Sequence, residues 1–292
     1  TGDNNIAIGV SAGDNLTSGY DNVLVGEDAG GTINTGYKNT VFGSNAGASI
    51  TSALQNTFVG QIAGQNSTIG RYNTAVGSAA LNKEDVGNGS VALGYAALYT
   101  QNSDSNNEET GNTGLGYETA FHNVTGQNNT WVGFKAGLGA SGQSNSSNTG
   151  IGKDAMLSIT TGGNNTAVGR ACGDALTDGE GNAFFGANAG GTTTSALEVT
   201  ALGYQAAYGG NITAAAIGTV AVGYNSLVSL TSGIGNVAIG SGSLAANATS
   251  DFNTAVGSAA LSKLTKDGTG ANTAVGYRAG LALTTGGTNT LM

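Results

Sequence analysis

The chain contains no proline, one cysteine, one histidine and one tryptophan among its 292 residues. Only 9% of its residues are charged, against about 25% in an average globular protein. The single Cys172 excludes an internal disulfide framework, and no apolar run approaches the ~18 residues of a membrane-spanning helix. With nine basic residues and a net charge of −9, the chain lacks the basic surface that nucleic acid or an anionic membrane would require. We therefore expect no nucleic-acid partner and no membrane insertion in this segment.

Glycine is abundant instead, at 52 residues, and it recurs at a fixed spacing. Collagen is excluded because there is neither a G-X-Y period nor proline. A search for internal repeats finds sixteen copies of a short unit, and eleven of the fifteen intervals equal the step from Gly9 to Gly26. The anchor glycines, from which positions are counted below, are Gly9, Gly26, Gly43, Gly60, Gly77, Gly94, Gly116, Gly133, Gly152, Gly169, Gly186, Gly203, Gly223, Gly240, Gly257 and Gly276.

The positions around each anchor carry their own pattern. Position −1 is large and apolar in all sixteen copies, and position −3 is β-branched in fifteen, ten of them Thr. Position −4 is Asn in thirteen copies, and position +3 is Ala in twelve, with Cys172 at the same place in another copy. Alternating β-branched and apolar residues indicate a short strand that ends at position −1.

The 17-residue unit fits one coil of a parallel β-solenoid and is too short for a helix pair or a propeller blade. We predict an all-β rod of about 16 coils that spans residues 1–292 as a single repeat array and belongs to a longer chain. Each coil should hold a strand before the anchor, a second short strand after it and a loop. Stacked Asn side chains should form an amide ladder. The extra residues of the longer intervals should lie in loops, the largest from Tyr99 to Gly111.

Positions −3 and −1 share one face of the strand, and their size suggests that they point inward. Position −2, which includes Leu24, Phe58 and Trp131, would then form an apolar stripe on the outside. Monomers rarely expose such a stripe. We therefore expect a homotrimer around a threefold axis, with a monomeric solenoid as the alternative.

Strings such as Asn253-Thr-Ala-Val-Gly-Ser-Ala-Ala-Leu261 and Asn165-Thr-Ala-Val-Gly169 resemble the head repeats of trimeric autotransporter (YadA-like) adhesins and the related repeat arrays of phage tail fibres. The resemblance extends over essentially the whole chain. It implies a left-handed parallel β-roll that trimerises along its axis on a virion or cell surface. The 17-residue unit is longer than the coils of the adhesin heads, and this difference favours the tail-fibre assignment.

The chemistry of an enzyme is not apparent. The only histidine, His122, has no second His or Cys nearby in sequence, and the carboxylate pairs are sequence neighbours. We expect no catalytic residues, no metal and no cofactor. Candidate contacts to a carbohydrate or protein receptor are the aromatic residues at position +1 and the acidic residues of the longest loop: Tyr95, Tyr117, Phe134, Tyr204, Tyr224, Tyr277, Asp104, Glu108 and Glu109.

The predicted function is therefore that of an extracellular structural fibre segment that presents loops for host receptor binding, as in a phage tail fibre. A bacterial adhesin head that binds host matrix or cells is the alternative. A tailspike-type glycosidase would need two carboxylates about 5–10 Å apart. An ice-binding solenoid would need Thr on an outward face, whereas the Thr residues here are expected to point inward.

Overall fold

A computed structural model describes residues 2–213 and 216–292. These residues form an all-β parallel solenoid of about 17 coils. Neither range contains a helix, and therefore no helix in these ranges is long and apolar enough to cross a membrane. The chain divides into two compact units, Thr1–Ser147 and Asn148–Met292.

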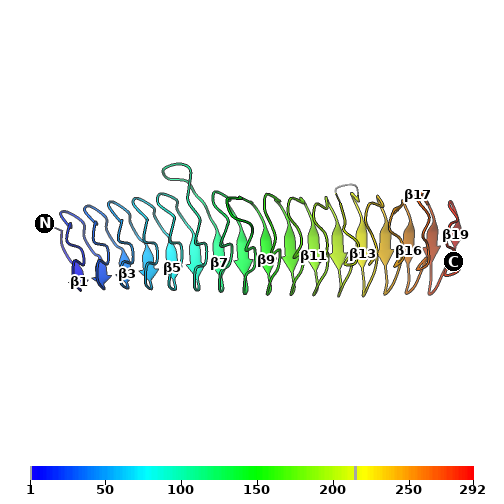
Figure 1. The fold of residues 1–292 in the computed structure, drawn as a ribbon, viewed down its shortest axis with the longest axis horizontal. Helices are drawn as coiled ribbons and strands as arrows, with labels where there is room; N and C mark the ends of the chain where they lie inside the picture. The colour runs from blue at the N-terminus through cyan, green and yellow to red at the C-terminus, as the bar shows by residue number, and fades with distance from the viewer. Residues whose placement is uncertain (1, 214–215) are drawn as a thin grey trace. The chain divides into compact units, whose positions relative to one another are not determined.

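The first unit stacks eight parallel strands in sequence order (Figure 1). Each strand pairs with the next in register, so that, for example, Thr57, Phe58 and Val59 lie opposite Thr74, Ala75 and Val76. The strands are β1 (Ile6–Ile8), β2 (Val23–Val25), β3 (Thr40–Phe42), β4 (Thr57–Val59), β5 (Thr74–Val76), β6 (Val91–Leu93), β7 (Thr113–Leu115) and β8 (Thr130–Val132).

The second unit repeats this arrangement. Its principal strands are β9 (Thr149–Ile151), β10 (Thr166–Val168), β11 (Ala183–Phe185), β12 (Thr200–Leu202), β13 (Val220–Val222), β14 (Val237–Ile239), β16 (Thr254–Val256), β18 (Thr273–Val275) and β19 (Thr290–Leu291). Two further strands, β15 (Ser250–Asp251) and β17 (Gly268–Thr269), pair with each other. All sixteen predicted anchors directly follow a three-residue strand, which confirms the register, including that of Gly223. The longer loop before Gly223 contains residues 214–215, which lie outside the described residues.

The predicted facing of the strands is wrong. Position −2 points into the coil and is buried in every three-residue strand except β1, whereas positions −3 and −1 are half-buried or exposed. Val76, for example, is half-buried, and Ala75 is fully buried. The reason is that position −2 lies on the same face as position −4, whose asparagine side chains are buried and hydrogen-bonded from coil to coil inside the stack.

The asparagines at position −4 form the predicted amide ladder. The Nδ2 of Asn39 donates to Oδ1 of Asn22 in the coil before, at 3.1 Å, and to the carbonyl of Ala53, at 2.9 Å. Its own Oδ1 accepts from the backbone N–H and Nδ2 of Asn56, each at 3.1 Å. A buried amide must be fully hydrogen-bonded to be tolerated, and this ladder satisfies each side chain while it joins successive coils.

The predicted second strand after the anchor does not form. Positions +2 and +4 both adopt positive φ, as Ala79 (φ 60°) and Leu81 (φ 50°) do after Gly77, and alternate left-handed residues make a turn rather than an extended segment. A third left-handed position, −5, turns the chain into the strand and includes Asp21, Lys38 and Tyr72. We call position −5 the corner position.

Positions −2 and +4 lie against each other across the interior, and a large side chain at one position is accompanied by a small residue at the other. Phe58 at −2 faces Gly64 at +4, where an added Cβ would lie 2.7 Å from the phenyl ring. Where −2 is only Ala75 or Ala92, position +4 holds the fully buried Leu81 or Leu98. The interior volume is thus filled in each of these coils, by one partner or the other.

Candidate functional site on the sheet face and the loop after β6

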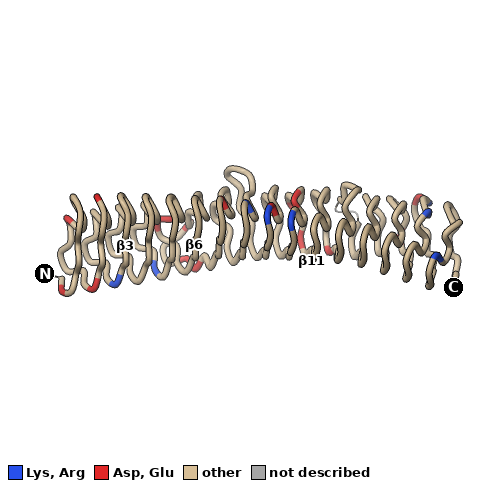
Figure 2. The backbone as a smooth tube through the Cα atoms, turned by 90° about the horizontal axis from the view of Figure 1, so that it is seen from below, with Lys and Arg blue, Asp and Glu red and all other residues tan. Residues whose placement is uncertain are grey.

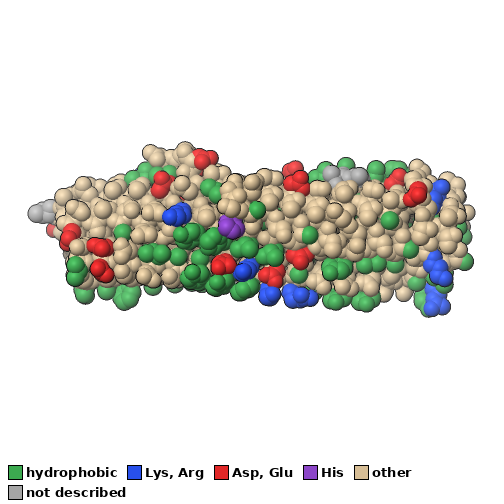
Figure 3. Space-filling view, viewed as in Figure 1, with side chains coloured by type: hydrophobic (Ala, Val, Ile, Leu, Met, Phe, Trp, Pro, Cys, Tyr) green, Lys and Arg blue, Asp and Glu red, His purple; other side chains and the backbone are tan. Residues whose placement is uncertain are grey.

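The outer face of the strands is a regular apolar surface. Large side chains at position −1 are exposed or half-buried, and Phe42 exposes 56% of its surface. In Figure 3, hydrophobic side chains gather along the side on which the strands lie. At positions −3, −1 and +1 of the first unit, only Glu27 carries a charge. Figure 2 shows how sparse the charges are along each unit. Exposed −1 side chains are Ile8, Phe42, Leu93, Leu115, Ile151, Phe185, Leu202, Ile239 and Val275.

The aromatic residues predicted at position +1 extend this surface. Tyr95, Tyr117 and Phe134 stack in one ladder, with ring centroids 5.2 Å apart at each step. In the second unit Tyr204 stacks on Tyr224 at 5.8 Å, and the guanidinium of Arg278 lies 5.0 Å from the ring centroid of Tyr277. All six rings are exposed.

The ladder has a polar margin in the first unit. A hydrogen bond to Glu118 raises the pKa of the Tyr117 phenol, and desolvation raises it further. The Tyr117 phenol therefore stays neutral through the physiological range. Glu118 also pairs with Lys135, at 3.4 Å. The ion pair between Glu118 and Lys135 is thus confined to the neighbouring turn position +2.

The acidic loop residues lie in the excursion after β6, which projects beyond the neighbouring coils (Figure 1). Glu108 caps the turn, because its Oε2 accepts from the N–H of Asp104 at 3.0 Å and its Oε1 accepts from Nε2 of Gln127. Asp104 and Glu109 are exposed. Glu109 pairs with Asn88 in an isolated bridge and lines a notch of about 290 Å³ together with Tyr72, Asn88, Gly89 and Gly111.

A buried polar network fixes the two ends of this excursion. Glu84 stands at position +7, where other coils bury Ile33 and Ile50. Its carboxylate accepts five hydrogen bonds: from the N–H groups of Val86, Gly87 and Ser103, from Nε2 of Gln101 and from Oγ of Ser103.

The network continues toward the notch. Gln101 Nε2 also donates to Oγ of Ser90 at 2.8 Å and Oγ1 of Thr110 at 3.2 Å, and the Thr110 hydroxyl donates to the carbonyl of Asn88 at 2.9 Å. Each polar atom of this chain of bonds is satisfied inside the coil, and such networks hold a backbone rigidly.

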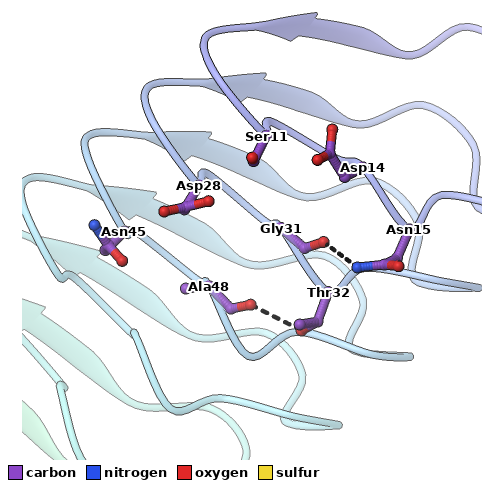
Figure 4. Close-up of a pocket in the computed structure, with 8 residues that line it drawn as sticks. All are labelled: Ser11, Asp14, Asn15, Asp28, Gly31, Thr32, Asn45 and Ala48. Atoms are coloured by element: carbon purple, nitrogen blue, oxygen red, sulfur yellow. Dashed lines mark hydrogen bonds between the residues drawn. The ribbon is translucent and has the colours of Figure 1, made fainter.

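The first coils carry a shallow depression of about 340 Å³ (Figure 4). Two of its side chains join successive coils, since Asn15 donates to the carbonyl of Gly31 at 2.7 Å and Thr32 to that of Ala48 at 2.7 Å. Asp14 and Asp28 are its carboxylates. Within residues 2–213 and 216–292 no group of three or more His, Cys, Asp or Glu side chains is placed to hold a metal ion.

No protein-family model matches this chain, and no curated protein matches it. Two surfaces are the candidates for a functional site: the apolar sheet face, which is present in both units, and the notch beside the projecting loop in the first unit.

Sequence reasoning missed three parts of these surfaces. It assigned position −1 to the interior, it did not single out Tyr72 and Asn88 of the notch, and it did not single out the buried Glu84. The signal for the notch was present in the repeat alignment, since Gly89 and Gly111 are consecutive glycines at the corner position, where the coils before carry Asp21, Lys38, Gln55 and Tyr72. The signal for the network was a carboxylate at an otherwise largely apolar position.

Cys172 should be inert in the folded protein. It is fully buried at position +3, its Sγ donates to the carbonyl of Phe184 at 3.3 Å, and burial raises the pKa of the thiol to about 12 from its ordinary 9.0. Because the thiolate is the nucleophile, we expect an aromatic disulfide reagent at pH 8 to leave the native thiol unmodified and to titrate one thiol per chain in denaturant.

The same shift makes stability depend on alkaline pH. Between pH 9 and about 12 the unfolded chain loses the thiol proton and the folded chain retains it, so Cys172 lowers the free energy of unfolding as pH rises through this window. The Cys172→Ala variant, with the residue usual at this position, should lack this component. Rapid modification of the native thiol would contradict the burial.

Proposed function

We propose that this chain is a non-catalytic segment of a trimeric fibre on a virion or cell surface, of the phage tail-fibre kind, and that it presents loops to a host receptor. The observation that carries the proposal is the regular, nearly uncharged apolar sheet face. This face, and not the row of position −2 side chains, is the apolar surface that other copies of the chain would cover. Water-exposed apolar surface of this extent favours association. A threefold axis along the strand stack would give each coil the same partners in the other two copies. A bacterial adhesin head that binds host matrix or cells is the alternative with the same architecture.

The mass in solution tests the assembly. Light scattering should give three times the 28.4 kDa of the chain, and this value should persist on dilution. A mass of one chain at all concentrations would contradict the trimer.

Two neighbouring residues separate assembly from folding. Leu93 at position −1 is exposed, and Ala92 at position −2 is fully buried. Leu93→Asp should keep the native circular dichroism spectrum and reduce the mass to 28.4 kDa, because it places a charge on the proposed contact face. Ala92→Asp buries a charge without a partner and should prevent folding of its coil. If Leu93→Asp remains trimeric, the outer face is not the contact.

The corrected facing supports a second candidate, binding to ice. Threonine at position −3 points outward, with Thr40, Thr57 and Thr74 on consecutive strands in register, so the reason for excluding this function no longer holds. Strands repeat at about 4.8 Å, which gives a regular array of hydroxyl and methyl groups.

The two candidates use the same face and therefore exclude each other. A monomeric mass together with thermal hysteresis that falls on Thr57→Tyr substitution would favour ice binding. A trimer without hysteresis would exclude it.

A further inference from the structure

We propose that the notch lined by Tyr72, Asn88, Gly89, Glu109 and Gly111 binds one ring of a neutral sugar, at the terminus or a branch of a glycan. The inference rests on the proposed receptor-binding function and names its ligand class. The notch lies at the corner of the coil, at and beside position −5, outside the sheet face assigned to self-association.

The notch exists because two successive coils lack a side chain at the corner. The corner side chain before it is Tyr72, the one after it is Asn128, and Gly89 and Gly111 stand between them, all four with positive φ. An added Cβ at Gly89 would meet no atom within 4 Å, so the space above this glycine is open. The resulting volume of about 290 Å³ is at the lower end of ligand pockets and suits a single ring.

The groups that converge on this space are those that recognise a polyhydroxylated ring. Tyr72 is 58% exposed and offers an aromatic face with a polar tip. Asn88 is only 9% exposed; its Oδ1 is used by the backbone N–H of Arg71 at 2.9 Å, and its Nδ2 donates to none of the residues that the structure describes. The Nδ2 of Asn88 is accessible to solvent, so a ligand hydroxyl in the notch can accept from it in place of water.

Glu109 completes the set as an acceptor. Its carboxylate takes part in no hydrogen bond or ion pair with the described residues, and it can accept from sugar hydroxyls while Asn88 donates to another. The notch is lined by one anionic and no cationic side chain, on a chain with a net charge of −9. This electrostatic environment favours neutral sugars over uronic or sialic acids.

The walls of the notch are held in place before any ligand arrives. Thr110, between Glu109 and Gly111, donates through its N–H and its hydroxyl to the carbonyl of Asn88, at 3.1 and 2.9 Å. The backbone N–H of Asn88 in turn donates to the carbonyl of Glu108 at 2.8 Å. The network that begins at Glu84 thus ends at Thr110 and Asn88, beside the space that the ligand would occupy. Because these residues are already held in place, less conformational freedom is lost on binding.

A comparable notch in the second unit provides an internal control. It surrounds the corner glycine Gly181 and is lined by Asn164, Glu180, Leu197 and Glu198, without an aromatic ring. Asn164 there already donates to Glu180 at 3.1 Å. It lies at the same corner position, with a volume of about 380 Å³, but it lacks the exposed ring and the amide donor that are available in the first notch.

The test is saturation-transfer NMR on the full chain with methyl glycosides of glucose, mannose, galactose and N-acetylglucosamine, and with glucuronate and N-acetylneuraminate as anionic probes. We expect transfer to at least one neutral glycoside and none to the anions. Gly89→Asn should reduce the transfer at least tenfold, because asparagine occupies the left-handed corner at Asn128 and Asn164 and would fill the notch without disturbing the coil. Tyr72→Ala should produce a similar loss, and Gly181→Asn should leave the transfer unchanged.

Absence of transfer to all four neutral glycosides, equal transfer to the anions, or transfer that survives both Gly89→Asn and Tyr72→Ala would overturn the inference. Light scattering on the same samples keeps the two proposals apart. A trimer that binds none of the glycosides would support the fibre proposal and overturn the sugar site. A monomer that binds them, with the expected loss in the variants, would support the sugar site and overturn the trimeric fibre.

Discussion

Replacement of Gly77 by alanine should remove the native fold of the coils around it and lower the free energy of unfolding of the first unit by about 3 kcal/mol or more. Gly77 has φ of +132°, a conformation that side chains rarely adopt, and an added Cβ would lie 2.4 Å from the carbonyl oxygen of Gly94 in the next coil. That oxygen belongs to the backbone of the stack, so it can retreat only if the coils separate. Urea unfolding followed by far-ultraviolet circular dichroism measures the loss.

A second glycine provides the control for this variant. Gly242, at position +2, also has positive φ (64°), but an added Cβ there would meet no atom within 4 Å, and Asn45 and Asn188 occupy the same position in other coils. Gly242→Asn should change the free energy of unfolding by less than about 0.5 kcal/mol. If Gly77→Ala is tolerated equally well, close approach at the anchor does not explain its recurrence.

Truncation of Trp131 to alanine should cost about 3–5 kcal/mol, the range for loss of a buried aromatic residue. Trp131 is fully buried at position −2 of β8, opposite Gly114 of β7, and an added Cβ at Gly137 would lie 2.3 Å from the indole. The ring therefore occupies the space that Gly137 leaves vacant, and its removal would leave a cavity in the interior. Urea unfolding of Trp131→Ala measures the cost.

Trp131→Phe separates volume from hydrogen bonding. The indole Nε1 is buried without a hydrogen-bond partner among the described residues, so its removal breaks no bond. Phe58 and Phe184 already occupy the same position in other coils, each beside a glycine at +4. We expect a loss of less than about 1.5 kcal/mol. A loss as large as that of the alanine variant would mean that the indole has a specific role beyond filling the interior.

The repeat determined the secondary structure directly from the sequence. Spacing between anchors placed all sixteen three-residue strands and their register, because stacked coils pair equivalent residues and a coil that is out of step would break every ladder at once. The asparagine ladder was predictable for the same reason. The pairing of a large residue with a small one at positions −2 and +4, as in Phe58 with Gly64 or Ala75 with Leu81, can also be recognised in the sequence once the two positions are known to face each other.

Only the tertiary structure decided which face of the strand is the interior. Size and hydrophobicity at Val76 and Leu93 indicated burial, but position −2 shares its face with the buried polar row of position −4. Ala75 and Ala92 therefore point inward, and Leu81 and Leu98 at position +4 fill the interior beside them. The path after the anchor was likewise hidden, since the left-handed conformation of Ala79 and Leu81 is imposed by stacking and has no signal in their residue types. The notch beside Tyr72 depends on the same geometry: its residues are separated in sequence, and the turn of the coil brings Asn88 and Glu109 onto one surface. Periodicity thus fixes which residues are equivalent, and the path of the backbone, set by the left-handed residues at positions −5, +2 and +4, decides which of them face the interior.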